Sequence, residues 1–218
     1  AFLEREYGVH FAVGGTGRLV EGMARLIRGQ GGTLRCNAEV AEIEVSGGRA
    51  CGVRLASGER VAADIVVSNA CSAWTYRHLL PGAARHRWTD RRIERSRYSM
   101  SLFVWYFGTK RRYESVPHHT ILLGPRYREL LVDIFKRKVL AEDFSLYLHR
   151  PTASDPSLAP PGCDAFYVLS PVPHLDAGID WNQTAERYRS AIARHLSRTL
   201  LPGLEDEIVT QRLMTPQD

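Results

Sequence analysis

A cluster of glycines ahead of an amphipathic segment is the first feature of this chain that could perform chemistry. The stretch HFAVGGTGRLVEGM, residues 10–23, has the look of a phosphate-binding turn, because glycine amides at the start of a helix attract anions. The dinucleotide-binding pattern G-x-G-x-x-G fails, since counting from Gly15 puts Val20 in the place of the third glycine. The phosphate-loop pattern fails as well, because Met23 stands where that pattern has a lysine. These glycines therefore need another explanation.

Few other side chains have the spacing of a catalytic or metal site. His118 and His119 are adjacent and could bind a metal, but no Asp, Glu or Cys pattern accompanies them, so a surface-loop role is favoured. Asp143, Asp155 and Asp164 show no partner for acid or base work. The four cysteines form no C-x-x-C pair, which argues against structural zinc and fits a reducing compartment. No metal site is predicted, and the catalytic residues stay unknown.

Composition indicates a globular protein with one large or two small domains. The chain has 218 residues, of which 44% are hydrophobic, so it can bury a sizeable core. Its net charge of +5 is spread along the sequence, which favours a solvated surface over nucleic-acid binding and leaves an anionic membrane surface possible. No apolar run is long enough to span a membrane, and AFLEREYGVH lacks the features of a signal peptide. We therefore expect a cytoplasmic location.

The first third of the chain predicts a helix and then a small sheet. Thr16 can cap a helix that ends at the glycines of residues 29–32. The turn pairs Gly47-Gly48 and Ser57-Gly58 then separate short strands within residues 33–37, 39–45, 49–57 and 59–70. Four apolar residues fall on one face of the helix at a spacing of i, i+4, i+7 and i+8: Leu19, Met23, Leu26 and Ile27.

The segment IVVSNA, residues 65–70, differs from its neighbours. Its continuous apolar start predicts a strand covered on both faces. In a doubly wound sheet, ligands lie at the carboxyl ends of such strands, so Ser68, Asn69 and Ala70 could approach a cofactor. The alternative is an ordinary strand-to-helix turn capped by Asn69 or Ser72.

The remaining residues predict a second domain. A helix is expected at residues 73–80, followed by a Pro-Gly break and a basic helical segment. Residues 151–163 form a Pro-rich loop. Alternating apolar and aromatic residues predict strands at 101–108, 120–123, 144–150 and 165–172, and helical periodicity predicts helices at 126–138 and 184–201.

These segments resemble a known group of enzymes. GGTGRLVEGMARLIRGQGG, NAEVAEIEV and GVRLASGERVAADIVVSNA resemble the middle of the flavin-dependent amine oxidase and phytoene desaturase superfamily. SLFVWYFG, HHTILLGPRYRELLVDIF and AEDFSLYLHRPTASDPSLAPPGCDAFYVLSPVPHL are similar to bacterial-type phytoene desaturases, which use FAD to introduce double bonds into a C40 polyene. The resemblance covers residues 1–218 but only an internal portion of the family's chain. We therefore interpret the sequence as a fragment, without the family's G-x-G-x-x-G start or its closing flavin-contacting segment.

The resemblance implies an α/β (α+β) fold with two parts. Residues 1–72 would be the middle part of an FAD-binding Rossmann-like domain, and residues 73–218 an incomplete, mixed-sheet substrate domain with flanking helices. It also implies a set of cofactor-binding residues: Gly14, Gly15, Val40, Asn69 and Ala70. The substrate-binding residues that it implies are Thr16, Gly17 and Arg18, although Arg18 could equally be a first-turn arginine in solvent.

The implied activity is desaturation of phytoene or a related carotenoid by hydride transfer to FAD, with FAD in the full-length parent and absent from this fragment. Two alternatives stay open: another flavin oxidoreductase, such as an amine oxidase, carotenoid isomerase or saturase, and a non-catalytic lipid- or protein-binding module. The implied partner is a lipophilic, phytoene-like polyene, and no binding of nucleic acid is expected. Self-association through exposed apolar surfaces is also expected.

Because a C40 polyene is collected from a bilayer, we also expect peripheral association with the inner membrane. Arginines of residues 85–97 and 126–138 could attract anionic lipid. Four apolar or aromatic side chains between them could insert shallowly, unless these segments are simply solvated helix faces: Trp88, Tyr98, Ile134 and Phe135.

Overall fold

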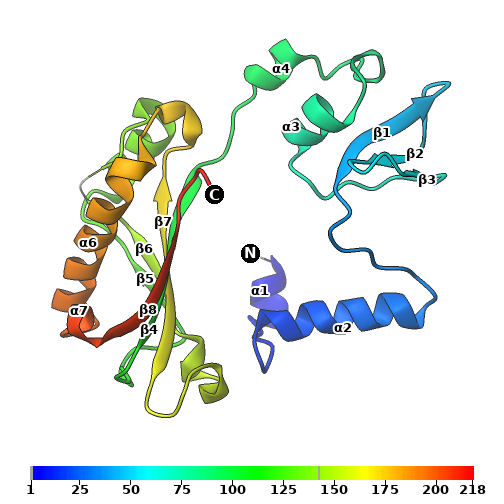
Figure 1. Cartoon of the computed structure of the whole chain (residues 1–218). Helices are drawn as coiled ribbons and strands as arrows, with labels where there is room; N and C mark the ends of the chain where they lie inside the picture. The colour runs from blue at the N-terminus through cyan, green and yellow to red at the C-terminus, as the bar shows by residue number, and fades with distance from the viewer. Residues whose placement is uncertain (1, 142) are drawn as a thin grey trace. The chain divides into compact units, whose positions relative to one another are not determined.

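A computed structural model describes residues 2–141 and 143–218 of the chain. The chain forms two compact units, one of Ala1–Met23 with Tyr98–Asp218 and the other of Ala24–Arg97 (Figure 1). The chain therefore passes between the units twice, after Met23 and after Arg97. The functional division between residues 72 and 73 stays a prediction, because compactness does not report which residues bind flavin.

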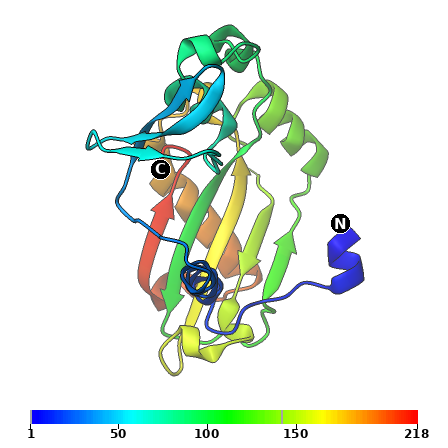
Figure 2. The ribbon, with the colours of Figure 1, turned by 90° about the vertical axis from the view of Figure 1, so that its right-hand side faces the viewer.

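The first unit is built on a five-stranded antiparallel sheet. Its strands are β4 (Ser101–Thr109), β5 (His119–Leu122), β6 (Leu146–His149), β7 (Asp164–Val172) and β8 (Ile208–Met214). They lie side by side in the order β5-β6-β7-β4-β8, with β8 and β5 at the two edges (Figure 2). The expected α/β (α+β) class is confirmed, but the sheet is antiparallel at every pairing and is not mixed as expected. β7 and β8 run in the same direction, but they do not pair with each other, because β4 lies between them.

Helical segments precede and connect these strands. They are α1 (Phe2–Tyr7), α5 (Tyr127–Val132), η3 (Asp133–Arg137), η4 (Pro151–Ala153), η5 (Pro156–Leu158), η6 (Leu175–Ala177), α6 (Trp181–Thr199) and α7 (Leu204–Glu207). The helices predicted at 126–138 and 184–201 are thus confirmed as α5 with η3 and as α6. Asp180 caps α6 by accepting a hydrogen bond from the Asn182 amide at 3.0 Å.

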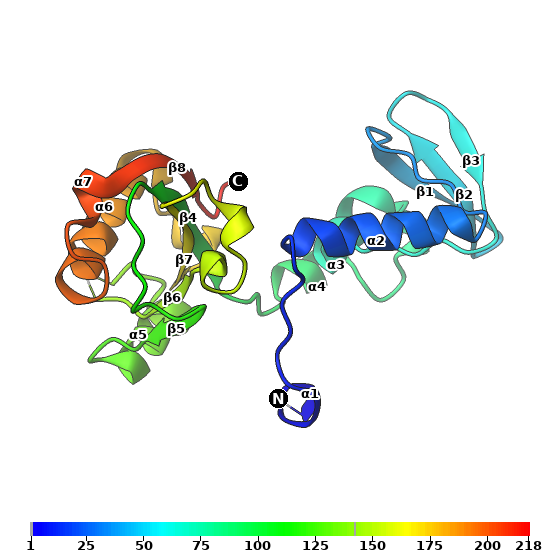
Figure 3. The same ribbon diagram turned by 90° about the horizontal axis from the view of Figure 1, so that it is seen from below.

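The core of this unit lies between the sheet and α6, which covers one of its faces (Figures 1 and 3). Every second residue of β4 is buried there, as a strand period of two requires. The helix contributes residues spaced three or four apart, as its period of 3.6 requires. The principal members are Phe103, Trp105, Phe107, Val168, Tyr188, Ile192 and Leu196.

A buried ion pair joins the loops at one end of the sheet. Arg150 donates to Asp164 over 2.9 Å, and their side chains are 3% and 0% exposed. Asp164 also accepts hydrogen bonds from the Tyr113 amide and the Thr152 hydroxyl, each at 2.7 Å. Arg150 makes a further bond to the Val116 carbonyl at 2.7 Å. A buried charge pair is tolerated when its remaining polar positions are satisfied in this way.

The second unit carries a smaller antiparallel sheet. Its strands are β1 (Val40–Ser46), β2 (Arg49–Leu55) and β3 (Arg60–Ala62), in that order, and its helical segments are α3 (Ser72–Trp74), η1 (Thr75–Leu79), η2 (Gly82–Ala84) and α4 (Asp90–Glu94). The small sheet predicted after the first helix is confirmed, although residues 33–37 form no strand. The helix itself is α2 (Thr16–Gly29), which runs from one unit into the other. None of its residues is buried, and its apolar face is exposed.

The predicted buried strand at IVVSNA is wrong for this structure. Residues 65–69 have no strand partner, and Ile65 and Val67 are 80% and 88% exposed. A strand is stabilised by neighbouring strands, and the described residues of this chain supply none beside this segment. The apolar side chains of this segment therefore favour burial, but they stay exposed in this structure.

The buried pair should dominate the stability of the first unit. Either Arg150→Met or Asp164→Leu should lower the free energy of unfolding by about 3–5 kcal/mol, because each removes the buried partner of the remaining charge, and Arg112, 4.0 Å from Asp164 and 40% exposed, only partly compensates. Urea denaturation of the 218-residue chain measures this change.

The double variant R150M/D164L should be markedly less destabilised than the sum of the two single variants, because no charge is then left unpaired. Glu186→Ala removes a carboxylate that is 68% exposed and pairs with Arg189, and it should leave the midpoint unchanged. Additive losses in the double variant would contradict the pairing argument.

Candidate functional site

The face of the five-stranded sheet opposite α6 is organised as rows of side chains that run across the strands. Directly paired residues share a face, so the register defines each row. One row crosses all five strands and is polar and aromatic: His119, His149, Tyr167, Tyr106 and Arg212. The row on one side of it is largely apolar: Ile121, Tyr147, Leu169, Val104 and Met214. We call this surface the open face.

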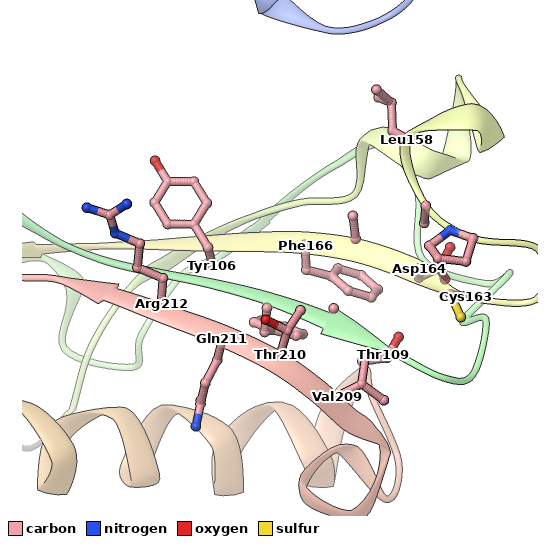
Figure 4. A pocket seen from close by; sticks show the side chains of 15 residues that line it. Tyr106, Thr109, Leu158, Cys163, Asp164, Phe166, Val209, Thr210, Gln211 and Arg212 are labelled. Carbon is pink, nitrogen blue, oxygen red and sulfur yellow. The ribbon is translucent and has the colours of Figure 1, made fainter.

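The row on the other side is small, which creates a pocket. Ala165, Gly108 and Thr210 pair across β7, β4 and β8. They form the floor of a trough of about 420 Å³ between the Tyr106 row and the loop that carries Leu158 and Pro160. Figure 4 shows Tyr106 and Arg212 on the same side of the sheet, whereas Gln211 points toward the helix side. A largely apolar concavity of this size suits a small-molecule ligand.

The size of this pocket depends on the glycine in β4. A Cβ on Gly108 would lie 3.1 Å from the Thr210 Cγ2, so a larger residue would crowd the floor between β4 and β8. Along the polar and aromatic row, the rings of Tyr106 and Tyr167 are 5.6 Å apart, and those of Tyr167 and His149 are 4.4 Å apart. The open face therefore offers a continuous aromatic surface beside the pocket.

Two titratable groups at the centre of this row, His149 and Tyr167, are neutral. Burial, followed by the charges of His118 and His119, lowers the pKa of His149 to about 4. Burial also raises the pKa of the Tyr167 phenol. At neutral pH the imidazole is therefore unprotonated and the phenol keeps its proton. Arg212 at the β8 edge is the charged member of the row.

The glycine turn predicted to form part of a site docks beside this pocket. Gly14 donates its amide hydrogen to Asp155 over 2.6 Å. Both Gly14 and Gly15 have positive φ, at 84° and 83°, which confirms the conformational freedom expected of them. A Cβ on Gly15 would lie 3.5 Å from Leu158, which lines the pocket. Asp155 itself accepts bonds from the Ser157 amide and hydroxyl, at 3.1 and 2.6 Å.

The other predicted substrate residues begin α2. Thr16, Gly17 and Arg18 are all exposed. The side chain of Arg18 folds back over Gly14, where an added Cβ would meet its Cγ at 2.6 Å, and it pairs with Glu21 at 3.1 Å. The role of these three residues in binding substrate stays a prediction.

The remaining predicted cofactor residues lie in the second unit. Val40 begins β1 and pairs with Leu55, and a register irregularity between Val40 and Glu42 leaves Ala41 without a strand partner. Asn69 and Ala70 are exposed, and the Ala70 amide donates to the Ser68 hydroxyl at 3.3 Å. Flavin binding by these residues stays a prediction.

The histidines and aspartates have partners that the sequence did not reveal. His119 begins β5 and pairs with His149, so the surface-loop interpretation of the histidine pair is wrong for that residue. Asp164 pairs with Arg150, Asp143 with Arg126, and Asp155 with the Gly14 amide. These partners are 14, 17 and 141 positions away along the chain, beyond the reach of a local pattern.

The fold is similar to the folds of solved structures. It matches the crystal structure of an oxidoreductase from Methanosarcina mazei with a TM-score of 0.66 and 20% identity, over 92% of this chain and 42% of that one. It also matches reduced UDP-galactopyranose mutase with a TM-score of 0.57 and 15% identity, over 92% of this chain and 39% of the other. At such low identities the likeness concerns the fold.

The sequence identifies the family. The model of the flavin containing amine oxidoreductase family matches residues 1–213, and the chain belongs to that family. It is 48% identical to the neurosporene-forming phytoene desaturase of Rhodobacter capsulatus, over 99% of this chain and 42% of that protein. It is 49% identical to the lycopene-forming phytoene desaturase of Pseudescherichia vulneris, over 99% of this chain and 44% of the relative. The chain thus spans less than half the length of these curated relatives.

The bond between Asp155 and Gly14 should hold the glycine turn in place. The Ser157 hydroxyl and then the Gly14 amide lower the pKa of Asp155, so the bond is present above the ordinary carboxyl pKa of 3.8 and is lost as pH falls through the lowered value. Asp155→Ala should therefore speed hydrogen exchange of the Gly14 amide by about tenfold. NMR detection of that single amide measures the change.

Asp176→Ala makes the same substitution at a carboxylate that does not contact the turn, and it should leave Gly14 exchange unchanged. The chemical shift of the Gly14 amide should titrate with a midpoint below 3.8. Exchange that is equal in wild type and Asp155→Ala would show that the bond does not constrain the turn.

Proposed function

We propose that the chain is a segment of an FAD-dependent carotenoid desaturase and carries the surface on which the polyene lies. The observation that carries this proposal is the open face, where an apolar row and an aromatic row lie side by side and the aromatic row borders a pocket with a floor of Gly108, Ala165 and Thr210. A long hydrocarbon gains free energy by leaving water for such a surface. The identities of 48% and 49% to phytoene desaturases support the same substrate class.

The chemistry of the open face suits a hydrocarbon that must be oriented without being charged. Because His149 and Tyr167 are neutral, an apolar ligand at the centre of the row does not have to desolvate charged side chains there. Aromatic rings such as those of Tyr106 and Tyr167 stack against conjugated double bonds. Relatives of nearly equal identity form neurosporene and lycopene, so we propose phytoene or a related carotenoid as substrate without assigning the product.

We propose that Gly14, Gly15, Val40, Asn69 and Ala70 contact FAD in the whole protein. When bound, FAD supplies the redox chemistry by accepting hydride from an allylic carbon. The unpaired bulge next to Val40 fits this role, because it leaves backbone groups free to bind a ligand. The positive φ angles of the glycine turn allow close approach of the backbone. The roles proposed for Thr16, Gly17 and Arg18 are contacts to the substrate.

The test uses the whole protein, purified and supplied with phytoene in liposomes. It should carry flavin and desaturate phytoene, with the products identified by their absorption spectra and by chromatography. Ala165→Trp should fill the pocket and lower kcat/KM by at least about tenfold, while flavin content stays at the wild-type level.

Ala83→Trp introduces the same ring at an exposed position in η2 and should leave turnover unchanged.

The 218-residue chain alone should purify without flavin, because it has no G-x-G-x-x-G turn to bind the pyrophosphate. It should also scatter light as an oligomer, since the apolar face of α2 is exposed.

Turnover of an amine, or isomerisation or saturation of a carotenoid, would favour the alternative flavin enzymes. A whole protein that binds polyene without flavin would favour a binding module.

We also propose that the whole protein is cytoplasmic and binds the inner membrane peripherally. None of the helices that the structure describes is long and apolar enough to cross a bilayer. Ile134 is only 2% exposed, so its expected insertion is wrong, and Trp88 is held by stacking on Tyr76. Phe135, 48% exposed, is better placed, because it lies in η3 beside exposed basic residues. Shallow insertion of an aromatic ring combined with basic side chains is typical of interfacial binding.

Phe135→Glu should reduce binding of the whole protein to anionic vesicles, because it replaces an inserting ring with a charge that the lipid repels. Liposome flotation measures the bound fraction, and 0.5 M salt should reduce it further, to about the level on neutral vesicles. Leu175→Glu makes a comparable change at another exposed position and should bind like wild type. Wild-type binding that is insensitive to both salt and lipid charge would contradict the electrostatic part of the proposal.

A further inference from the structure

Three histidines converge at the β5 edge of the open face. We propose that His118, His119 and His149 form a binding site for one divalent ion of the zinc class, Zn²⁺, Co²⁺ or Ni²⁺. One ring nitrogen from each histidine lies within 4.8 Å of the other two. The register brings them together, because His119 pairs with His149 across β5 and β6 and His118 immediately precedes His119.

The distances fit a site that closes around a metal with small side-chain movements. The Nε2 atoms of His118 and His149 are 2.7 Å apart. Zinc-to-nitrogen bonds of about 2.0–2.1 Å at a tetrahedral angle separate neighbouring ligand nitrogens by about 3.3 Å. This spacing lies between the shortest and the largest separations in the cluster. Small rotations of the imidazoles would bring the nitrogens toward this spacing.

Two of the histidines already have the partners that orient metal ligands. The Nδ1 of His118 is 2.5 Å from the Ser154 hydroxyl, and the Nδ1 of His119 is 2.6 Å from the Tyr147 hydroxyl. A ligating histidine usually donates its other ring hydrogen to such a partner, which fixes the tautomer and the ring orientation. In both residues this arrangement leaves Nε2 available for the ion.

A satisfied hydrogen-bond network, the ordinary explanation of a buried histidine, does not account for His149. This residue is 9% exposed, and its Nδ1 is buried without a hydrogen-bond partner in the described part of the chain. Its Nε2 faces the Nε2 of His118, so a single hydrogen is shared by two nitrogens. An ion between the two Nε2 atoms would bind both of them, although it would leave the Nδ1 of His149 as it is.

The site is bordered by aromatic rings on one side and is accessible to solvent on the other. The Phe11 ring lies 4.6 Å from the His118 ring in an edge contact, and the Tyr167 ring lies 4.4 Å from that of His149. His119 is exposed, so the ion can enter from solvent and keep a water molecule as its fourth ligand. Three imidazoles without a carboxylate favour zinc-class ions over Mg²⁺ and Ca²⁺, which prefer oxygen ligands.

Metal binding would cross-link the short edge strand β5 to β6 and hold it in the sheet. Edge strands are the less protected parts of a sheet, so such a link has a structural purpose. This inference does not depend on the proposed desaturase activity, because it uses neither flavin nor polyene.

The test is a titration of the tag-free 218-residue chain, and of the whole protein, with Zn²⁺ and with Co²⁺. One equivalent of zinc should remain bound after dialysis, and Co²⁺ should give the visible absorption of a site with nitrogen ligands. His119→Ala removes an exposed side chain, and it should weaken zinc binding at least about tenfold, as should Tyr147→Phe through the orientation of His119. The double variant H118A/H119A should abolish binding.

His86→Ala removes an exposed histidine outside the cluster and should bind zinc like wild type. Zinc should also slow amide exchange in β5 of wild type and leave that of H118A/H119A unchanged, which separates a loss of site from a loss of fold. Binding that survives H118A/H119A, or an absence of zinc from wild type at micromolar free metal, would overturn the proposal.

Discussion

The buried pair of Arg150 and Asp164 is the constraint on which the functional end of the first unit depends. Asp164 begins β7 and lines the pocket, whereas Arg150 directly follows His149 at the end of β6. Through the Tyr113 amide and the Val116 carbonyl, the pair also fixes the loop that leads to His118. Because both charges are removed from water, each requires the other, and the loops cannot separate without exposing one of them unpaired. One interaction therefore positions the pocket rim and the histidine cluster together.

The antiparallel register turns this fixed end into a chemically ordered surface. Alternation assigns one set of residues to the α6 core and the other to the open face, and pairing then aligns the second set into rows. A shift of one residue between β4 and β7 would move Tyr106 and Gly108 into the core and bring Phe107 to the open face. The packing of the core against α6 thus determines, at a distance, which side chains a ligand meets.

The sequence predicted what depends on local patterns. Alternation located β4 and β7, helical spacing located α2 and α6, and glycine chemistry identified the turn at Gly14. It missed β8, whose sequence IVTQRLM alternates too weakly to stand out. It also could not assign the partners of His149 and Asp164, because register and loop docking bring together residues that are distant along the chain. Residues 65–67 show a second limit of sequence analysis. Their apolar side chains favour burial, but burial also requires neighbouring strands, and these residues stay exposed.

The histidines show why polarity read from sequence alone misleads about such a surface. His118, His119 and His149 count as polar, yet burial and their mutual proximity lower the pKa of His149 to about 4 and also lower that of His118. At neutral pH the imidazoles of His118 and His149 are therefore uncharged and bring no charge to the adjoining apolar row. Burial, and not the polarity of the residue type, therefore determines which protonation state these two groups present to the open face.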